Sequence, residues 1–350
     1  MSQTLIERAL SEGTPLIDGT TATFIWQGES APAILADFNG WIMSPQAEMT
    51  PVGEDAWALS VELPADAYIE YALSVDQERI FDPFNPHKTP NGFGKFNNYF
   101  YMSQDDELEE LARRKPGVPH GQVFGRDIQP GFYFGSRPRR VHFYQPPVAE
   151  PCPLVVVWDG QDYLRRAHLP VIVDNLIAQQ RIQPVALAMV ENNRRSRAIE
   201  YLCSEATLMF LTNSVLPAAH ESLNLLDIES QPGAYGVLGS SAGGLLALYT
   251  GLRLPNIFGK VLAQSGAYSL FGREFVVWDL LRLVDPRALK IWLAAGCYEM
   301  LVRINRQLAE ALKDHGFDFH YNEYSGGHNY PSWRRDAAMG LEFLFETNNS

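Results

Sequence analysis

The stretch Gly-Ser-Ser-Ala-Gly at residues 239–243 constrains the fold of this chain more than any other. It follows a short apolar run at 234–238, which is typical of a buried strand, and it leads into an Ala- and Leu-rich stretch at 242–252, which predicts a helix. Glycines around Ser241 let the backbone turn sharply between strand and helix, and this pattern matches the G-x-S-x-G nucleophile elbow. The helix would direct its N-terminal dipole toward Ser241, where negative charge develops during acyl transfer. A glycine-rich connection without a catalytic role is the alternative.

Apolar runs alternate with helical patterns from residue 139 onward. This alternation predicts βαβ units and a mainly parallel sheet flanked by helices, with Ser241 at the carboxyl end of a central strand, where open α/β sheets bind ligands. The expected strands are 141–144, 154–158, 185–190, 234–238, 261–264, 291–295 and 319–323, and the expected helices are 169–180, 206–223, 242–252, 275–283, 301–315 and one beginning near residue 331.

The N-terminal part of the chain has the pattern of a β-sandwich. Its short strands, separated by clusters of Gly, Pro, Asp and Asn, are expected at 23–27, 33–36, 57–63, 68–75 and 98–102. We predict a first domain over 1–104, an interdomain linker over 105–138 that begins with a short charged helix, and a second domain over 139–350. Trp41 and Trp57 could stack on a sugar or catecholate ring, although packing within the sandwich is the commoner role of such residues.

Composition narrows the range of partners. The formal net charge of −13 disfavours nucleic acid and anionic membranes. The three cysteines cannot all pair and lack metal-ligand spacing, which indicates reduced thiols in a cytoplasmic protein. The first residues lack the basic flank and apolar core of a signal peptide, and no apolar run is long enough to span a membrane. We therefore expect a cytoplasmic protein without a membrane partner, and we make no prediction of its oligomeric state.

A serine nucleophile needs a base and an acid that orients the base. His328 follows the last expected strand in the sequence Ser-Gly-Gly-His-Asn, where two glycines allow a sharp loop, and the order serine, acid, histidine is that of α/β hydrolases. Glu299 follows the preceding strand at the head of a helix, where it could be the acid or could simply complement the helix dipole. Asp285 and Asp279 are the fallback acids, and Asp285 precedes a proline in a turn-like setting.

Two backbone N–H groups are the expected oxyanion donors. One belongs to Ala242, directly after the nucleophile, and the other belongs to Gln161, for which a simple tight turn is the alternative. A basic cluster after the strand at 185–190 could attract an anionic substrate, or it could be a solvated loop in which Arg197 pairs with a carboxylate such as Glu200. The members of this cluster are Arg194, Arg195 and Arg197.

Residues 154–345 resemble the enterochelin (ferric enterobactin) esterases, within the wider esterase D and antigen 85 group of α/β hydrolases. The segments that carry this resemblance are Trp-Asp-Gly-Gln-Asp-Tyr at 158–163, Gly-Ser-Ser-Ala-Gly-Gly-Leu-Leu-Ala-Leu-Tyr at 239–249, Phe-Gly-x-Val-Leu-Ala-Gln-Ser-Gly at 258–266, Ala-Gly-x-x-Glu at 295–299 and Gly-Gly-His-Asn-x-x-x-Trp-Arg at 326–334. Near the N-terminus, Asp-Phe-Asn-Gly-Trp at 37–41 and Phe-Asp-Pro-Phe-Asn-Pro at 81–86 resemble early-set immunoglobulin-like modules.

The resemblance implies an α/β hydrolase with an N-terminal immunoglobulin-like β-sandwich. It implies Ser241 as nucleophile, His328 as base and Glu299 as acid, with Gln161 and Ala242 as oxyanion donors. Members of the family carry Gly-Gln-Ser-Phe-Gly-Gly at the elbow, and residues 192–201 keep only the outline of the family's Arg-x-x-Glu-Leu motif. These departures from the family pattern weaken the prediction of the substrate more than the prediction of the catalytic chemistry.

The function predicted from these features is that of a serine esterase that forms an acyl-enzyme on an enterobactin-type ferric siderophore lactone. The expected substrate-binding residues are Arg194, Arg197 and Trp333. We expect no cofactor and no metal site, because the iron would belong to the substrate. A feruloyl or acetyl ester on a carbohydrate is the alternative substrate, and a catalytically silent carbohydrate-binding or scaffold protein is the alternative of another class.

Overall fold

The computed structural model describes residues 2–92, 94–103, 107–131 and 137–347. The chain divides into two compact units: the smaller comprises Met1–Asp106, Gly296–Met300 and Tyr324–Ser332, and the larger comprises Glu107–Ala295, Leu301–Glu323 and Trp333–Ser350. The boundary predicted between residues 104 and 105 lies outside the described residues. Two short stretches from the second half of the sequence therefore belong to the unit that is built from the N-terminal part.

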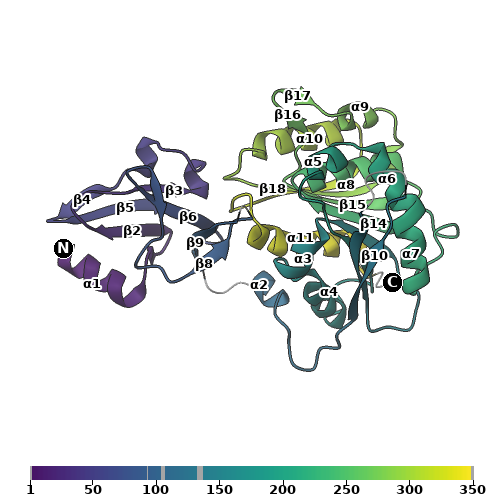
Figure 1. Ribbon diagram of the computed structural model, residues 1–350, viewed down its shortest axis with the longest axis horizontal. Helices are drawn as coiled ribbons and strands as arrows, with labels where there is room; N and C mark the ends of the chain where they lie inside the picture. The colour runs from purple at the N-terminus through teal and green to yellow at the C-terminus, as the bar shows by residue number, and fades with distance from the viewer. Residues whose placement is uncertain (1, 93, 104–106, 132–136, 348–350) are drawn as a thin grey trace. The chain divides into compact units, whose positions relative to one another are not determined.

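Two β-sheets form the body of the smaller unit (Figure 1). One sheet has the strand order β1-β2-β5-β4, and the other has the order β3-β6-β9-β8, with β7 paired to β6. Apolar side chains from both sheets share one core, which includes Phe24, Ile34, Ile69 and Phe100. The elements are α1 (Ser2–Glu12), β1 (Leu16–Asp18), β2 (Thr21–Gln27), β3 (Ala33–Ala36), β4 (Thr50–Gly53), β5 (Ala56–Glu62), β6 (Tyr68–Val75), β7 (Glu78–Ile80), β8 (Lys88–Pro90) and β9 (Phe96–Tyr101).

Alternating apolar residues located the central strands of this unit. Strands β3 and β6 have the predicted bounds, and the ends of β2, β5 and β9 lie within two residues of the predicted ends. Helix α1 is missing from the sequence prediction because most of its residues are polar. It packs mainly through Ala9, which joins Leu16, Ile25 and Ala58 in a small separate core.

An eight-stranded sheet forms the centre of the larger unit, in the order β10-β11-β13-β12-β14-β15-β18-β19. Strands β10, β11 and β13 pair antiparallel, and the neighbours from β13 to β18 pair parallel. Strands β12, β13 and β14 are buried along their whole length, as their continuous apolar sequences predict. The strands are β10 (Gln122–Ile128), β11 (Arg139–Gln145), β12 (Leu154–Trp158), β13 (Ala186–Val190), β14 (Tyr235–Ser240), β15 (Phe258–Gln264), β18 (Lys290–Gly296) and β19 (Asp318–Tyr324).

The helices of the larger unit follow the predicted alternation with strands. They are α2 (Glu107–Leu111), α3 (Gly160–Arg165), α4 (Leu169–Ala178), α5 (Arg197–Tyr201), α6 (Glu205–Phe210), α7 (Leu216–Ser222), α8 (Ala242–Arg253), α9 (Val277–Leu280), α10 (Val302–Asp314) and α11 (Tyr330–Phe345). A two-stranded ribbon of β16 (Ser269–Leu270) and β17 (Arg273–Glu274) completes the described elements.

The structure differs from the sequence predictions at three places in this unit. Strand β10 lies in the predicted linker and pairs with β11 over its whole length, so this part of the stretch adds an edge strand to the sheet. The helix predicted over 206–223 is interrupted by a π-helical turn at Leu211–Val215, directly before a helix that has Pro217 in its first turn, where the ring cannot donate an N–H. Helix α9 is shorter than the predicted helix at 275–283.

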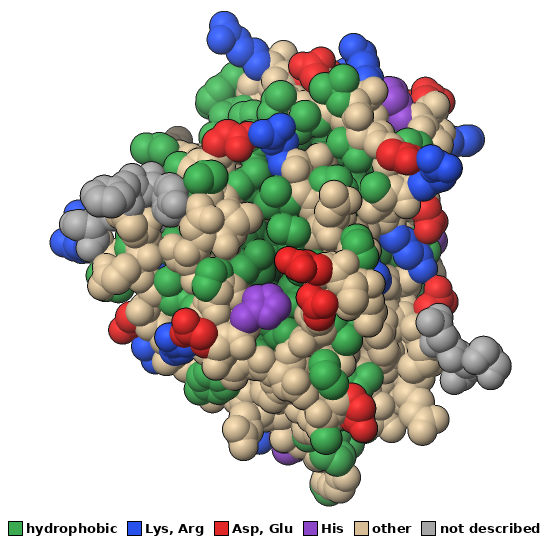
Figure 2. Space-filling model, turned by 90° about the vertical axis from the view of Figure 1, so that its right-hand side faces the viewer, with side chains coloured by type: hydrophobic (Ala, Val, Ile, Leu, Met, Phe, Trp, Pro, Cys, Tyr) green, Lys and Arg blue, Asp and Glu red, His purple; other side chains and the backbone are tan. Residues whose placement is uncertain are grey.

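Charged side chains of both signs are interspersed on one face of the molecule. On the face shown in Figure 2, Lys and Arg side chains alternate with Asp and Glu side chains among the described residues. Within the described ranges, no helix has both the length and the apolar character needed to cross a membrane.

Candidate active site

Ser241 occupies the turn between β14 and α8 in a strained backbone conformation. Its φ of 59° and ψ of −123° lie in a region that residues with a side chain rarely adopt. The Ser241 N–H donates to the carbonyl of Gln264 at 2.9 Å, and its carbonyl accepts from the N–H of Ala267 at 3.1 Å. These bonds hold the turn in place, while the preceding hydroxyl residue, Ser240, is buried at the end of β14. The local geometry is that expected of a nucleophile elbow.

Close approach of the backbone explains the glycine that precedes the serine. A Cβ atom on Gly239 would lie 2.3 Å from the carbonyl oxygen of Gly243, in the first turn of α8. A side chain at this position would push the helix away from the strand, so the turn around Ser241 could not close. The sequence pattern therefore reflects packing of the backbone as well as access to the serine hydroxyl.

A second turn lies at the carboxyl end of β12, the strand next to β14 in the sheet. Asp159 has a left-handed conformation with φ 56°, and α3 begins at Gly160. A Cβ atom on Gly160 would lie 2.2 Å from the carbonyl carbon of Met189 in β13, so only glycine fits there. Gln161 and Ala242 are thus both within the first two residues of a helix, where backbone N–H groups have no partner within the helix.

Asp159 is the centre of a polar cluster that the sequence analysis missed. Its buried carboxylate accepts from Nε of Arg197 at 2.8 Å and from Nδ2 of Asn192 at 2.5 Å, and its N–H donates to the hydroxyl of Tyr201 at 2.9 Å. The guanidinium of Arg197 also lies 4.9 Å from the centre of the Tyr201 ring. Arg197 is therefore held by Asp159, while the neighbouring Arg194 is exposed.

The suggested pairing of Arg197 with Glu200 is wrong. Glu200 is buried and accepts from Nη2 of Arg139 at 2.8 Å and from the hydroxyl of Ser196 at 2.6 Å. The sequence favours Glu200 because it is close to Arg197 along the chain, whereas Asp159, which follows β12, is 38 residues away from Arg197.

Glu299 and His328 lie side by side in the smaller unit. Oε2 of Glu299 is 2.5 Å from Nδ1 of His328, and Oε1 accepts from the backbone N–H of Gly296 at 3.2 Å. The Glu299 side chain is completely buried, whereas 36% of the His328 side chain is exposed. A neutral imidazole that donates its Nδ1 proton to the carboxylate keeps a lone pair on Nε2, which is the arrangement of a general base.

Backbone hydrogen bonds join the segments that carry these two residues. The N–H of Cys297 donates to the carbonyl of Tyr324 at 3.0 Å, and the N–H of Tyr298 donates to the carbonyl of Gly326 at 3.2 Å. The position of the Glu299–His328 pair is therefore set by main-chain contacts on both sides.

The fallback acids have other surroundings. Asp285 accepts from the backbone N–H of Arg287 at 3.0 Å and forms an ion pair with its guanidinium at 2.8 Å, which is a turn-capping role. Asp279 lies on α9 and is exposed. The carboxylate that the structure brings to His328 is that of Glu299.

The predicted site residues thus belong to different compact units. Ser241, Ala242 and Gln161 belong to the larger unit, and Glu299 and His328 belong to the smaller unit. Within the parts of the chain that are described, no group of three His, Cys, Asp or Glu side chains could hold a metal ion.

Trp333 has a structural environment. Its side chain is 5% exposed, and its indole N–H donates to the hydroxyl of Ser265 at 2.8 Å. Its carbonyl accepts from Nε2 of Gln264 at 2.8 Å. These contacts leave almost no indole surface for a substrate, so Trp333 is not part of the site proposed below.

Asp336 is a buried carboxylate that the sequence analysis did not identify. Burial raises the pKa of Asp336 to about 6, while hydrogen bonds from Asn322, Gln264 and Trp292 lower it. Gln264 also accepts the Ser241 N–H through its backbone carbonyl. Asp336 therefore belongs to the polar network that fixes the strand supporting the nucleophile turn.

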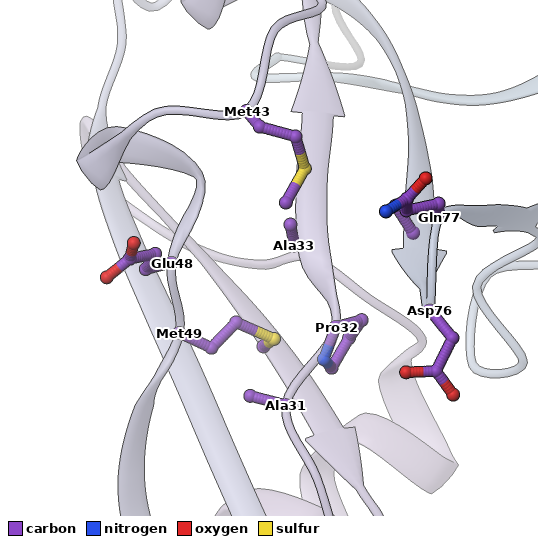
Figure 3. Close-up of a pocket in the computed structure, with 9 residues that line it drawn as sticks. Ala31, Pro32, Ala33, Met43, Glu48, Met49, Asp76 and Gln77 are labelled. Atoms are coloured by element: carbon purple, nitrogen blue, oxygen red, sulfur yellow. The ribbon is translucent and has the colours of Figure 1, made fainter.

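A shallow hollow lies in the smaller unit, apart from these residues. Figure 3 shows that Met43 and Met49 line it together with Pro32, Asp76 and Gln77. None of the predicted site residues lines this hollow.

The mainly parallel sheet and the strained serine turn define the larger unit as an α/β-hydrolase-type fold. The enterobactin esterase from Shigella flexneri, crystallised in the presence of enterobactin, aligns with a TM-score of 0.73 and 24% identity over 93% of this chain and 92% of that chain. A ferulic acid esterase aligns with a TM-score of 0.54 and 16% identity over 65% of this chain and 98% of that chain. At these identities the similarity establishes the fold.

Sequence comparison places the chain in a family. Residues 135–344 match the model of the family named Esterase, which is more than half of the chain, so this chain belongs to that family. The iron(III) enterobactin esterase of Escherichia coli strain K12 is 30% identical over 206 residues, which cover 57% of this chain and 51% of that protein. The chain spans about half the length of the curated relatives that it matches first.

Proposed function

We propose that this chain is a serine esterase that hydrolyses carboxylic ester bonds of an enterobactin-type ferric siderophore lactone. The observation that carries the chemistry is the backbone of Ser241, which is held at positive φ between a buried strand and a helix N-terminus. Such strain is retained where the surrounding structure enforces it, and it is common at catalytic residues.

In the proposed mechanism, Oγ of Ser241 attacks the ester carbonyl while Nε2 of His328 accepts the hydroxyl proton. Glu299 holds the Nδ1 proton and stabilises the imidazolium that forms. The N–H groups of Ala242 and Gln161 donate to the oxyanion of the tetrahedral intermediate. Collapse of this intermediate releases the alcohol, which takes the proton from His328, and leaves an acyl group on Ser241. Water then attacks the acyl-enzyme with His328 as base, which releases the acid and restores the serine.

The substrate is inferred from relatives and from charge. Several relatives are named as iron(III) enterobactin or salmochelin esterases. A ferric catecholate is an anion, and the exposed Arg194 is a cation near the carboxyl end of β13, on a chain of formal net charge −13. We assign Arg194 to substrate attraction and Arg197 to the support of Asp159.

For the smaller unit we propose an early-set immunoglobulin-like module. Its two sheets with a shared core and its Asp-Phe-Asn-Gly-Trp turn support this assignment. The indole N–H groups of Trp41 and Trp57 donate to Asp37 and to the carbonyl of Gly28, respectively, so the N–H of each ring is used within the sandwich. The alternative substrates, feruloyl or acetyl esters of carbohydrates, are used as comparison substrates in the test below.

A serine-reactive fluorophosphonate probe tests the nucleophile. Wild type should be labelled and Ser241→Ala should not, while Ser240→Ala is the matched control because it removes the adjacent hydroxyl and should keep its labelling. Equal labelling of wild type and Ser241→Ala would remove Ser241 from the mechanism. Chromatography after incubation with ferric enterobactin should detect linear dihydroxybenzoyl-serine products, and faster turnover of feruloyl or acetyl sugars would replace the siderophore with a carbohydrate ester.

A further inference from the structure

Asp37 is a buried carboxylate that the proposed chemistry does not use. It begins a single 3₁₀ turn at Asp37–Asn39, directly after β3, and its side chain is enclosed, with the residue 4% exposed. Oδ1 accepts from the indole N–H of Trp41 at 2.9 Å, and Oδ2 accepts from the backbone N–H of Glu70 at 2.8 Å. Both bonds come from the sandwich, so they fix the carboxylate with respect to the two sheets.

The loop that carries His328 lies directly against this carboxylate. A Cβ atom on Gly327 would be 2.2 Å from Cγ of Asp37, which means that the backbone next to His328 touches the carboxyl group. On the other side of His328, Nδ2 of Asn329 lies 3.4 Å from Oδ2 of Asp37. The residues immediately before and after the histidine therefore both contact one side chain from the N-terminal part of the chain.

The sandwich also holds the start of the same loop through its backbone. The N–H of Tyr68, the first residue of β6, donates to the carbonyl of Ser325 at 3.1 Å, and Tyr68 forms a parallel bridge with Gly326. The path of the loop is therefore set at residues 325, 326, 327 and 329 by groups from β6 and from the turn after β3.

The carboxylate of Asp37 interacts electrostatically with Glu299 and His328. Burial raises the pKa of Asp37 to about 6, the bonds from Glu70 and Trp41 lower it, and the charges of Glu299 and His328 raise and lower it, respectively. An anion at Asp37 would attract the positive charge that develops on the ring when the serine proton is transferred. The titratable and charged groups around Asp37 and Trp41 are Tyr68, Glu70, Arg79, Glu299 and His328.

We propose that Asp37 is a positioning residue for His328, so that the N-terminal sandwich supplies part of the support of the catalytic base. Glu299 orients the imidazole ring through Nδ1, and Asp37 fixes the backbone on both sides of the ring. This inference rests on the proposed role of His328 as base. It explains why residue 327 is glycine: any side chain there would move the loop away from Asp37.

The test compares Asp37→Asn with Asp82→Asn. Asp82 is a control matched for burial, because it is also enclosed in the sandwich and accepts from the hydroxyls of Thr14 and Tyr71 at 2.7 Å each. Hydrolysis of p-nitrophenyl butyrate should show kcat reduced about 10- to 100-fold in Asp37→Asn, as expected for a displaced catalytic group, with KM changed less than about 3-fold. Asp82→Asn should keep the wild-type kcat and KM.

A second variant approaches the same contact from the loop. Gly327→Ala leaves Asp37 intact but pushes the loop away from it, so kcat should fall as in Asp37→Asn. The double variant should be little worse than the more impaired single variant, because both changes disturb the same support of the loop. Wild-type kcat in Gly327→Ala would overturn the proposal. This variant tests the proposal even if urea denaturation shows that Asp37→Asn is unfolded.

The outcome also separates this inference from the proposed function. His328→Gln should abolish hydrolysis of p-nitrophenyl butyrate and fluorophosphonate labelling if His328 is the base. An inactive His328→Gln together with a fully active, folded Asp37→Asn would overturn only the role of Asp37. Full activity of His328→Gln would overturn the proposed function, and the role of Asp37 with it.

Discussion

Replacement of Glu299 by glutamine tests the assignment of the acid most directly. The substitution keeps the size of the side chain and removes its charge, so packing should change little. In the native structure both carboxylate oxygens are acceptors: Oε1 accepts from the N–H of Gly296, and Oε2 faces Nδ1 of His328. Glutamine has only one oxygen acceptor and one NH₂ donor, so it cannot match both partners.

Two arrangements of the glutamine are possible, and both impair the base. If the amide oxygen faces Nδ1, a charge-assisted hydrogen bond is replaced by a neutral one, and the N–H of Gly296 is left facing an NH₂ group. An unmatched buried donor costs about 1–3 kcal/mol, which corresponds to a factor of roughly 5 to 150 in a rate or equilibrium constant. If the NH₂ group faces Nδ1 instead, the imidazole proton moves to Nε2, and this wrong tautomer reduces kcat by about 10⁴-fold in serine proteases.

We therefore expect Glu299→Gln to lower kcat/KM for p-nitrophenyl butyrate by about 10²- to 10⁴-fold. Stopped-flow or plate-reader kinetics across pH 5–9 measure this loss, and urea denaturation checks that the variant is folded. Glu200→Gln is the control, because Glu200 is also buried and also accepts two hydrogen bonds, but its partners are Arg139 and Ser196. A folded Glu299→Gln that stays within about 5-fold of wild type across this range would show that the base needs no carboxylate at position 299.

Three further predictions concern stability. Gly160→Ala places a Cβ atom 2.2 Å from the carbonyl carbon of Met189, so the free energy of unfolding should fall by at least about 1–3 kcal/mol; an unchanged urea midpoint would contradict this close approach. Arg197→Ala leaves the buried Asp159 without its cation, and since Arg197 is itself 30% exposed we expect a loss of about 2 kcal/mol in urea denaturation, below the range for a fully buried pair. Burial raises the pKa of Asp336 to about 6, above its ordinary value, so its ionised form costs stability above pH 6 and this cost is relieved as the pH falls toward 4. When the pH is lowered from 7 to 5, the free energy of unfolding of Asp336→Asn should therefore increase less than that of wild type. Equal increases would show that burial does not raise the pKa of Asp336.

Much of the architecture could be read from local patterns. Strands buried on both faces need continuous apolar runs, and β12 has the predicted bounds for this reason. Strand β10 was not predicted because it is an edge strand whose residues are mostly exposed. The glycines and prolines on both sides of it are typical of a loop. Its pairing with β11 comes from backbone hydrogen bonds, which leave little trace in the pattern of side chains.

The site shows the same division between local and long-range features. Ser241 and Glu299 could be proposed as site residues from the sequence because each follows a buried strand, next to glycine or at the head of a helix. Asp159 and Asp37 could not be located in this way, because their partners are distant in sequence: Arg197 is 38 residues from Asp159, and Asn329 is 292 residues from Asp37. The Asp-Phe-Asn-Gly-Trp turn at 37–41 was visible in the sequence as a fold signature, but nothing local linked it to His328.

The position of His328 is set by the contacts of the loop that carries it. Residues 324–332 run from the last residue of β19 into the first turn of α11, yet their contacts place them in the unit formed by the N-terminal sheets. The loop has few apolar residues of its own, and its backbone is held by Tyr68 and by the segment after β18. A loop of this kind takes its shape from the surface on which it lies, because it has no core that could specify one. For this reason the proposed base depends for its position on residues from the N-terminal part of the chain.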